Sequence, residues 1–157
     1  MTRPRRSGAT AVETVVVLVV LFLIVFGILV GGVGVFRHQQ VACLSREGAR
    51  WASVRGGQCY KETDQAPPTA AQIAERAVHP LAVGMNPAAV TVQVEWIDRG
   101  TNTTTSWDAA PKDVWSVTPS GEVVTNAVRV TVSYQWAPGV GWQSMTMTSV
   151  TETPLSN

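Results

Sequence analysis

The chain has 157 residues, and its 12 basic residues nearly balance its 11 acidic ones. Three of the basic residues, Arg3, Arg5 and Arg6, precede the first apolar segment, and their removal would leave nine basic residues and a formal charge of −2 in place of +1. This balance gives no reason to expect nucleic acid as a partner.

An uncharged run from Thr14 to Phe36 follows the basic segment. Val15 to Val35 is almost entirely Val, Leu, Ile, Phe and Gly, and about 20 such residues at about 1.5 Å each cross a hydrocarbon core of about 30 Å. We therefore expect a transmembrane helix. A secretory signal would have a shorter apolar region and a small-residue cleavage site, and a buried helix of a soluble protein would be shorter and show a polar face.

The N-terminal segment Arg-Arg-Ser-Gly-Ala-Thr-Ala-Val-Glu, residues 5–13, resembles the precursors of type IV pilin-like proteins, and specifically TadE-like pseudopilins of the tight-adherence (Flp) pilus system. Such precursors carry a short basic leader that ends in Gly, an acid at the fifth mature position, and an apolar helix. A prepilin peptidase cuts after the Gly. The resemblance implies cleavage between Gly8 and Ala9, with Glu13 as the fifth-position acid.

A second segment carries the same resemblance. Residues 45–52 contain Arg46, Glu47, Gly48 and Arg50, and they are similar to the Arg-Glu-Gly-Ala-Arg sequence that follows the membrane helix in this family. The chain departs from the family at Thr14, where an aromatic residue usually follows the acid. It also lacks a second acid late in the helix.

Glu13 opens a membrane-length apolar segment, where a carboxylate loses hydration unless another group compensates for it. Cleavage after Gly8 would create a cationic amine on Ala9, one helical turn before Glu13. The amine could pair with Glu13 of the same chain or of a neighbouring chain, and two charges about 4 Å apart attract by about 4 kcal/mol at an effective dielectric near 20, before desolvation. The second pairing would set the register between subunits. Alternatively, Glu13 only interacts with the helix dipole, worth about 0.3–1 kcal/mol.

Small residues lie late in the apolar run. Gly27 and Gly31 form a Gly-xxx-Gly pair, with Gly32 and Gly34 close by, and such residues let membrane helices approach closely. They are either a helix-packing face or a site of local flexibility.

The helical pattern continues beyond Phe36, with Val41, Leu44 and Gly48 on one face, and we expect one helix from about Val12 to Arg55. Cys43 and Cys59 lie after the span, on the side expected to be oxidising, and a disulfide between them would contribute about 3 kcal/mol. The alternative is two separate thiols. No ligand spacing indicates a metal site.

The remainder predicts a small α+β domain with an antiparallel sheet packed on the helix. We expect a helical segment over residues 70–83, with an apolar face at Ile73, Ala77 and Leu81, and a long polar excursion over residues 98–121. The predicted strands cover residues 90–97, 127–136 and 142–150, with a short one near 115–117. The domain organisation is then a basic leader (1–8), a transmembrane helix (9–36), a helical extension and loop (37–64), and an extracytoplasmic α+β domain (65–157).

Enzyme motifs are missing from the sequence: it has no Gly-rich phosphate loop, no metal-binding helix motif and no Gly-x-Ser-x-Gly. We expect no catalytic residues and no cofactor. Among the six tryptophans, Trp96 and Trp136 are predicted to be in the core, whereas Trp107 and Trp115 are the candidates for exposed contact residues.

The resemblance and the apolar run together predict a minor pilin of the tight-adherence pilus. The chain would be a prepilin peptidase substrate in the bacterial cell membrane, single-pass, with a cytoplasmic N-terminus and an extracytoplasmic domain. Its partners would be membrane lipid, other pilin-like subunits and the assembly machinery, in secretion and cell adhesion. The first alternative is an unprocessed membrane anchor that carries an extracytoplasmic binding module, and the second is a membrane-tethered enzyme.

Overall fold

The computed structural model describes residues 7–56, 66–139 and 143–156. The chain divides into two compact units, Met1–Arg37 and His38–Asn157. Helix α1 (Ser7–Ser53) begins in the first unit and ends in the second.

In the first unit, the large side chains of α1 are exposed. They are valine, leucine, isoleucine and phenylalanine, and none of the most apolar 18-residue window is buried. A core helix of a soluble protein would hide such side chains, because exposed apolar area in water is unfavourable. This one apolar helix among the described residues could span a membrane, which is consistent with membrane anchoring.

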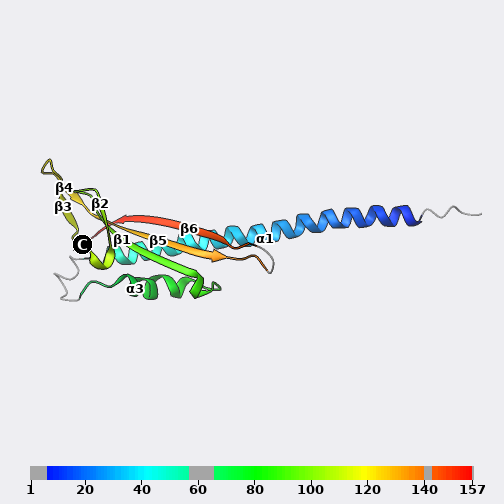
Figure 1. The fold of residues 1–157 in the computed structure, drawn as a ribbon, viewed down its shortest axis with the longest axis horizontal. Helices are drawn as coiled ribbons and strands as arrows, with labels where there is room; N and C mark the ends of the chain where they lie inside the picture. The colour runs from blue at the N-terminus through cyan, green and yellow to red at the C-terminus, as the bar shows by residue number, and fades with distance from the viewer. Residues whose placement is uncertain (1–6, 57–65, 140–142, 157) are drawn as a thin grey trace, which may run out of the picture. The chain divides into compact units, whose positions relative to one another are not determined.

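The second unit is built on a four-stranded antiparallel sheet in the order β2-β1-β5-β6 (Figure 1). Its strands are β1 (Val90–Asp98), β2 (Thr103–Ser106), β5 (Ala127–Trp136) and β6 (Met145–Pro154). The short strands β3 (Trp115–Val117) and β4 (Val123–Thr125) pair as a separate two-stranded ribbon. The expectation of an α+β protein, with a long apolar helix and an antiparallel sheet, is confirmed.

Alternation along the strands gives the sheet one apolar and one polar face. On β5, Val128, Val130 and Val132 are fully buried, whereas the intervening Arg129 and Thr131 are partly exposed. Side chains alternate across a strand, so the valines form a continuous stripe. The helices lie against this stripe.

The second helical segment starts at α3 (Ala70–Ile73) and continues through η1 (Ala74–Val78) and η2 (His79–Leu81). Two further short turns are η3 (Pro87–Ala89) and η4 (Trp107–Ala109). Thr69 begins α3 with a capping box, in which its side chain accepts from Gln72 N and the Gln72 side chain accepts from Thr69 N.

The expected apolar face of this segment is only partly right. Ile73 and Ala77 are buried, but Leu81 is 48% exposed and Val78 is buried in its place. The helix widens to π geometry over η1 and tightens to 3-10 geometry over η2, so residues after Ala77 leave the spacing of a regular α-helix.

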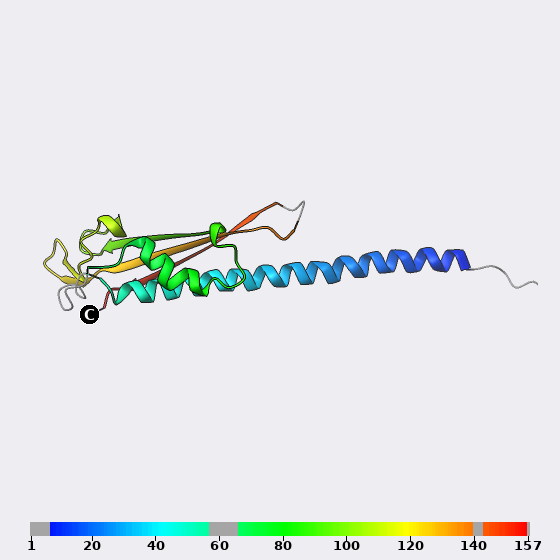
Figure 2. The same cartoon turned by 90° about the horizontal axis from the view of Figure 1, so that it is seen from below.

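Gly48 is where three elements meet. The last turns of α1 and the α3 segment lie on the same side of the sheet (Figure 2). A Cβ on Gly48 would lie 3.1 Å from Val78 Cγ2 of η1 and 3.3 Å from Val130 Cγ1 of β5. Glycine therefore permits the close packing of this core, which also buries Val41, Leu44, Ala52, Ile73, Val94, Trp96 and Val128.

Hydroxyl groups join α1 to β6. The side chain of Ser45 is fully buried, and its Oγ lies 2.9 Å from both Ser149 Oγ and Thr151 Oγ1. Beyond β6, Ser156 N donates to the carbonyl of Ser53, at the end of α1. The edge strand β6 is thereby fixed to the helix by polar as well as apolar contacts.

Candidate functional site

The segment that carries the proposed cleavage site opens α1. Gly8, Ala9 and Glu13 lie in its first two turns, and Glu13 is exposed. Thr14 Oγ1 donates to the carbonyl of Thr10 at 2.8 Å, so this side chain is satisfied within the helix. Cleavage after Gly8 and the register role of Glu13 stay predictions.

The helix glycines have open space around them. A Cβ placed on Gly27, Gly31 or Gly32 would meet no heavy atom within 4 Å. Nothing in the described chain therefore requires glycine at these positions, in contrast to Gly48. A role in helix packing would involve another molecule, and that role stays a prediction.

The family-like segment has two faces. Gly48 lies in the core, whereas Arg46 and Arg50 are exposed. Arg50 Nη2 donates to Glu47 Oε1 at 2.8 Å, and this hydrogen bond holds the pKa of the Glu47 carboxyl below its ordinary value. Arg46 Nε donates to the carbonyl of Ala42. The pair and the glycine thus have separate roles, one at the surface and one in packing.

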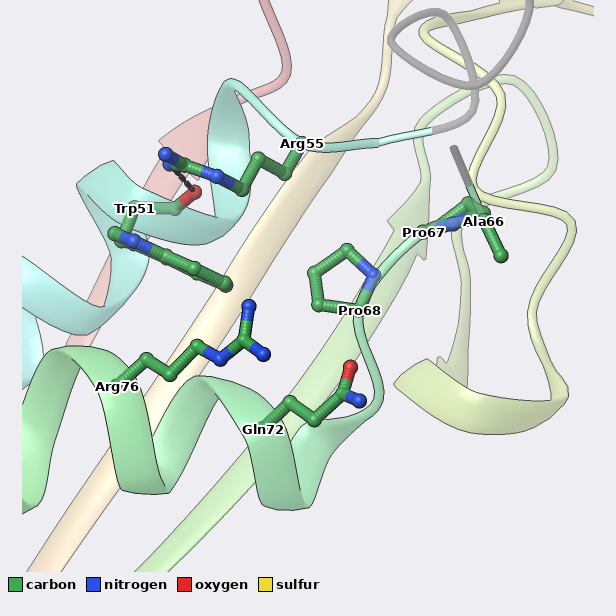
Figure 3. A pocket seen from close by; sticks show the side chains of 7 residues that line it. All are labelled: Trp51, Arg55, Ala66, Pro67, Pro68, Gln72 and Arg76. Atoms are coloured by element: carbon green, nitrogen blue, oxygen red, sulfur yellow. Dashed lines mark hydrogen bonds between the residues drawn. The ribbon is translucent and has the colours of Figure 1, made fainter. Parts of the chain in front are cut away.

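A pocket lies between the end of α1 and the start of the α3 segment (Figure 3). The described residues that line it are Trp51, Arg55, Ala66, Pro67, Pro68, Gln72 and Arg76. The Arg55 guanidinium stacks over the Trp51 ring, with its central carbon 4.2 Å from the ring centroid. Arg76 and Gln72 enter from the second helix, one turn apart. The described residues of the lining include two cationic side chains and no acidic one.

Three of the four predictions about tryptophan burial are confirmed, and one is wrong. Trp96 and Trp136 are buried and Trp115 is 49% exposed, as predicted. The prediction that Trp107 is exposed is wrong: its side chain is fully buried, and its Nε1 donates to the carbonyl of Pro68 at 2.7 Å. Trp107 begins the short turn η4, which places its indole against the residues that precede α3. No local sequence pattern indicates this position.

Cys43 is exposed on α1, and Cys59 lies outside the described residues, so the disulfide stays a prediction. Within the described ranges, no three His, Cys, Asp or Glu side chains gather as a metal site would require.

The sequence patterns do not single out the pocket. Arg55 marks only the expected end of the long helix, and no motif includes Arg76 or Gln72. The signal that could have found them is the repeated spacing of four: Trp51 in the last turn of α1 and Arg55 in the turn after it, and Gln72 and Arg76 on the next helical segment. The connection between these helices then brings the two pairs together.

Of the comparisons with known proteins, one finds a match, and this match covers the N-terminal part of the chain. No curated protein and no solved structure matches the chain significantly. A family model described as TadE-like protein matches residues 8–50, which include the proposed mature N-terminus, the apolar helix and the segment around Gly48. This match is consistent with a TadE-like protein, and the TadE-like family suggests association with the machinery of the Tad pilus system.

Proposed function

We propose that this chain is a minor pilin-like subunit, a pseudopilin, whose function is assembly and not catalysis. A prepilin peptidase would remove residues 1–8, and the mature helix would join other pilin-like subunits in the bacterial membrane or in a pilus. The external domain would lie on the extracytoplasmic side and make lateral contacts.

The observation that carries the proposal is the single exposed acid at the start of an exposed apolar helix. Glu13 is the one charged residue between Ser7 and Phe36. Among the described residues it forms no ion pair within the chain. In lipid, such a carboxylate needs a compensating charge. The Ala9 amine released by cleavage would lie one helical turn away, and the corresponding amine of a neighbouring subunit would offer the same charge between chains.

The first test is the mass and N-terminal sequence of the chain purified from native membranes that contain the peptidase. We expect a chain that starts at Ala9. The Gly8→Ala variant should keep its leader, because the peptidase would recognise the glycine residue itself and not the folded structure. Alanine at Gly8 meets nothing within 4 Å and favours a helix, so misfolding would not explain the loss of processing.

Gly32→Ala is the matched control, because it makes the same change on the same helix and in equally open space. It should be processed normally. Recovery of an intact leader on the unmodified chain would contradict the proposal. Glu13→Gln then tests the role of this carboxylate in assembly: processing should persist, and recovery of the chain in assembled pili should fall at least tenfold.

An unprocessed membrane anchor with a binding module is the second candidate. The pocket beside Trp51 favours it, because a binding function needs a recognition site in the external domain. Retention of the leader together with ligand binding at this pocket would support the anchor over the pseudopilin.

A further inference from the structure

The pocket at the end of α1 is rich in hydrogen-bond donors. Arg55 and Arg76 can only donate hydrogen bonds. The Gln72 side-chain oxygen already accepts from Thr69 N at 3.1 Å, which leaves the amide NH₂ available. The side chains that line the pocket therefore present N–H groups to whatever enters it.

The two cations are not neutralised by the described part of the chain. Neither Arg55 nor Arg76 forms an ion pair there, unlike Arg50, Arg99 and Arg129, which each pair with a glutamate. Two guanidinium groups beside one small pocket favour an anion. The complementary ligand carries negative charge and hydrogen-bond acceptors.

Arg55 is held ready for such a ligand. Its guanidinium lies over the Trp51 ring, and its Nη1 donates to the Trp51 carbonyl at 3.3 Å, which uses one of its five N–H groups. A guanidinium matches both oxygens of a carboxylate, and the stacked Arg55 adds a fixed positive charge beside the pocket. The stacking lowers the entropy cost of fixing the side chain on binding.

The size of the pocket selects among anions. Its volume is about 120 Å³, which is the space of about four water molecules and less than the roughly 300–1,000 Å³ of small-molecule sites. Pro67 and Pro68 supply apolar walls. A single side chain with an aliphatic stem fits this space, whereas a nucleotide would extend beyond it into solvent.

We propose that this pocket binds an acidic segment of a partner protein by taking up one glutamate or aspartate side chain. The carboxylate accepts from the Arg76 guanidinium, its stem lies against Pro68, and Arg55 adds positive charge from the other side of the Trp51 ring. Docking of this kind requires no processing at Gly8, so the inference stands apart from the proposed function.

The test is calorimetric titration of the full chain, in a non-ionic detergent at low salt, with the capped peptide acetyl-Gly-Glu-Glu-Gly-amide. We expect saturable binding that weakens as salt is raised and is lost below about pH 4, where the peptide carboxylates become protonated. The matched Gln-Gln peptide should bind at least tenfold more weakly. Equal binding of the two peptides would overturn the proposal.

Arg76→Gln should weaken binding of the acidic peptide at least fivefold, and because this side chain is exposed the fold should be unaffected. Arg46→Gln is the matched control: it removes one exposed arginine from outside the pocket and should change binding less than twofold. Equal losses for the two variants would show a general charge effect and overturn the site. Inorganic phosphate that binds as tightly as the peptide would overturn the assignment to an acidic protein segment.

Discussion

The glycines of α1 have different surroundings in the two units of this molecule: open space in the first and a packed core in the second. In the first unit, a Cβ added to Gly27 or Gly31 would meet nothing within 4 Å, whereas in the second a Cβ added to Gly48 would meet Val78 and Val130 at 3.1 and 3.3 Å. The fold of the chain explains the glycine of the second unit and leaves those of the first without an internal reason. A glycine with open space around it on an apolar helix favours close packing against a molecule outside the chain.

The largest effect is expected at Gly48. Gly48→Leu forces a branched side chain between η1 and β5 and should destabilise the second unit by about 2–3 kcal/mol, because a packed core tolerates added volume poorly. Thermal unfolding of the full chain in detergent measures this. Gly27→Leu is the control with the same added volume, and an equal loss from both variants would contradict the difference between the two units.

A smaller loss is expected at the buried tryptophan of η4. Trp107→Phe keeps an aromatic ring but removes the N–H that the Pro68 carbonyl accepts, which should cost about 1–2 kcal/mol. Trp115→Phe, at an exposed position, should change stability by less than about 0.5 kcal/mol. Chemical denaturation of both variants gives the comparison, and equal stabilities would mean that the buried hydrogen bond is worth nothing.

The stability that the polar face of the sheet contributes should fall only slightly at acid pH. The hydrogen bond from Arg99, with a further one from Arg129, holds the pKa of Glu152 below its ordinary value. Because the folded-state pKa is the lower one, this stabilisation is present above the ordinary glutamate pKa of about 4.3 and is lost as the pH falls through the folded-state value. For so exposed a pair we expect about 0.5 kcal/mol at neutral pH.

Denaturation across pH 2–7 gives the free energy of unfolding of Glu152→Gln and of the unmodified chain, and the difference between the two measures this contribution. The difference should vanish at the acidic end. Glu122→Gln serves as control, because Glu122 forms no ion pair within the described ranges. A difference that is constant with pH would assign the effect of Glu152 to packing.

The smallest effect on folding is expected in the first unit. Gly27→Leu should leave the unfolding of the second unit unchanged within about 0.5 kcal/mol, because an added side chain meets no described residue within 4 Å of the Cβ. Its effect should be seen in association of the helix in lipid vesicles, followed by energy transfer between labelled chains. Unchanged association would leave Gly27 and Gly31 without a packing role.

The sequence predicted the elements whose burial follows a simple period. The alternating valines of 90–97 and 127–136 form β1 and β5 almost residue for residue, because one face of each is buried. Strand β6 was expected over 142–150 and is found at Met145–Pro154, since its threonine-rich sequence alternates weakly. The short strands β2 and β4 were not expected, because the pairing that defines them is not visible in three or four residues.

Of the candidate sites, the sequence indicates only the one that lies within a single helix, and its role stays a prediction. The segment from Gly8 to Glu13 is contiguous, so its pattern can be recognised directly. The pocket combines residues from two helices that are separated by a connection, and Trp107 is buried by contacts far along the chain. Such juxtapositions depend on tertiary packing, which local periodicity does not encode.

The hydroxyl contacts between Ser45 and β6 also bear on the order of folding. Ser45 meets Thr151 across 106 residues of sequence, so the helix is synthesised long before the strand that completes its surroundings. Contacts of such long range form slowly, because a large loop must close before they stabilise anything. During synthesis the packing face of residues 41–52 therefore stays uncovered until β6 has been made.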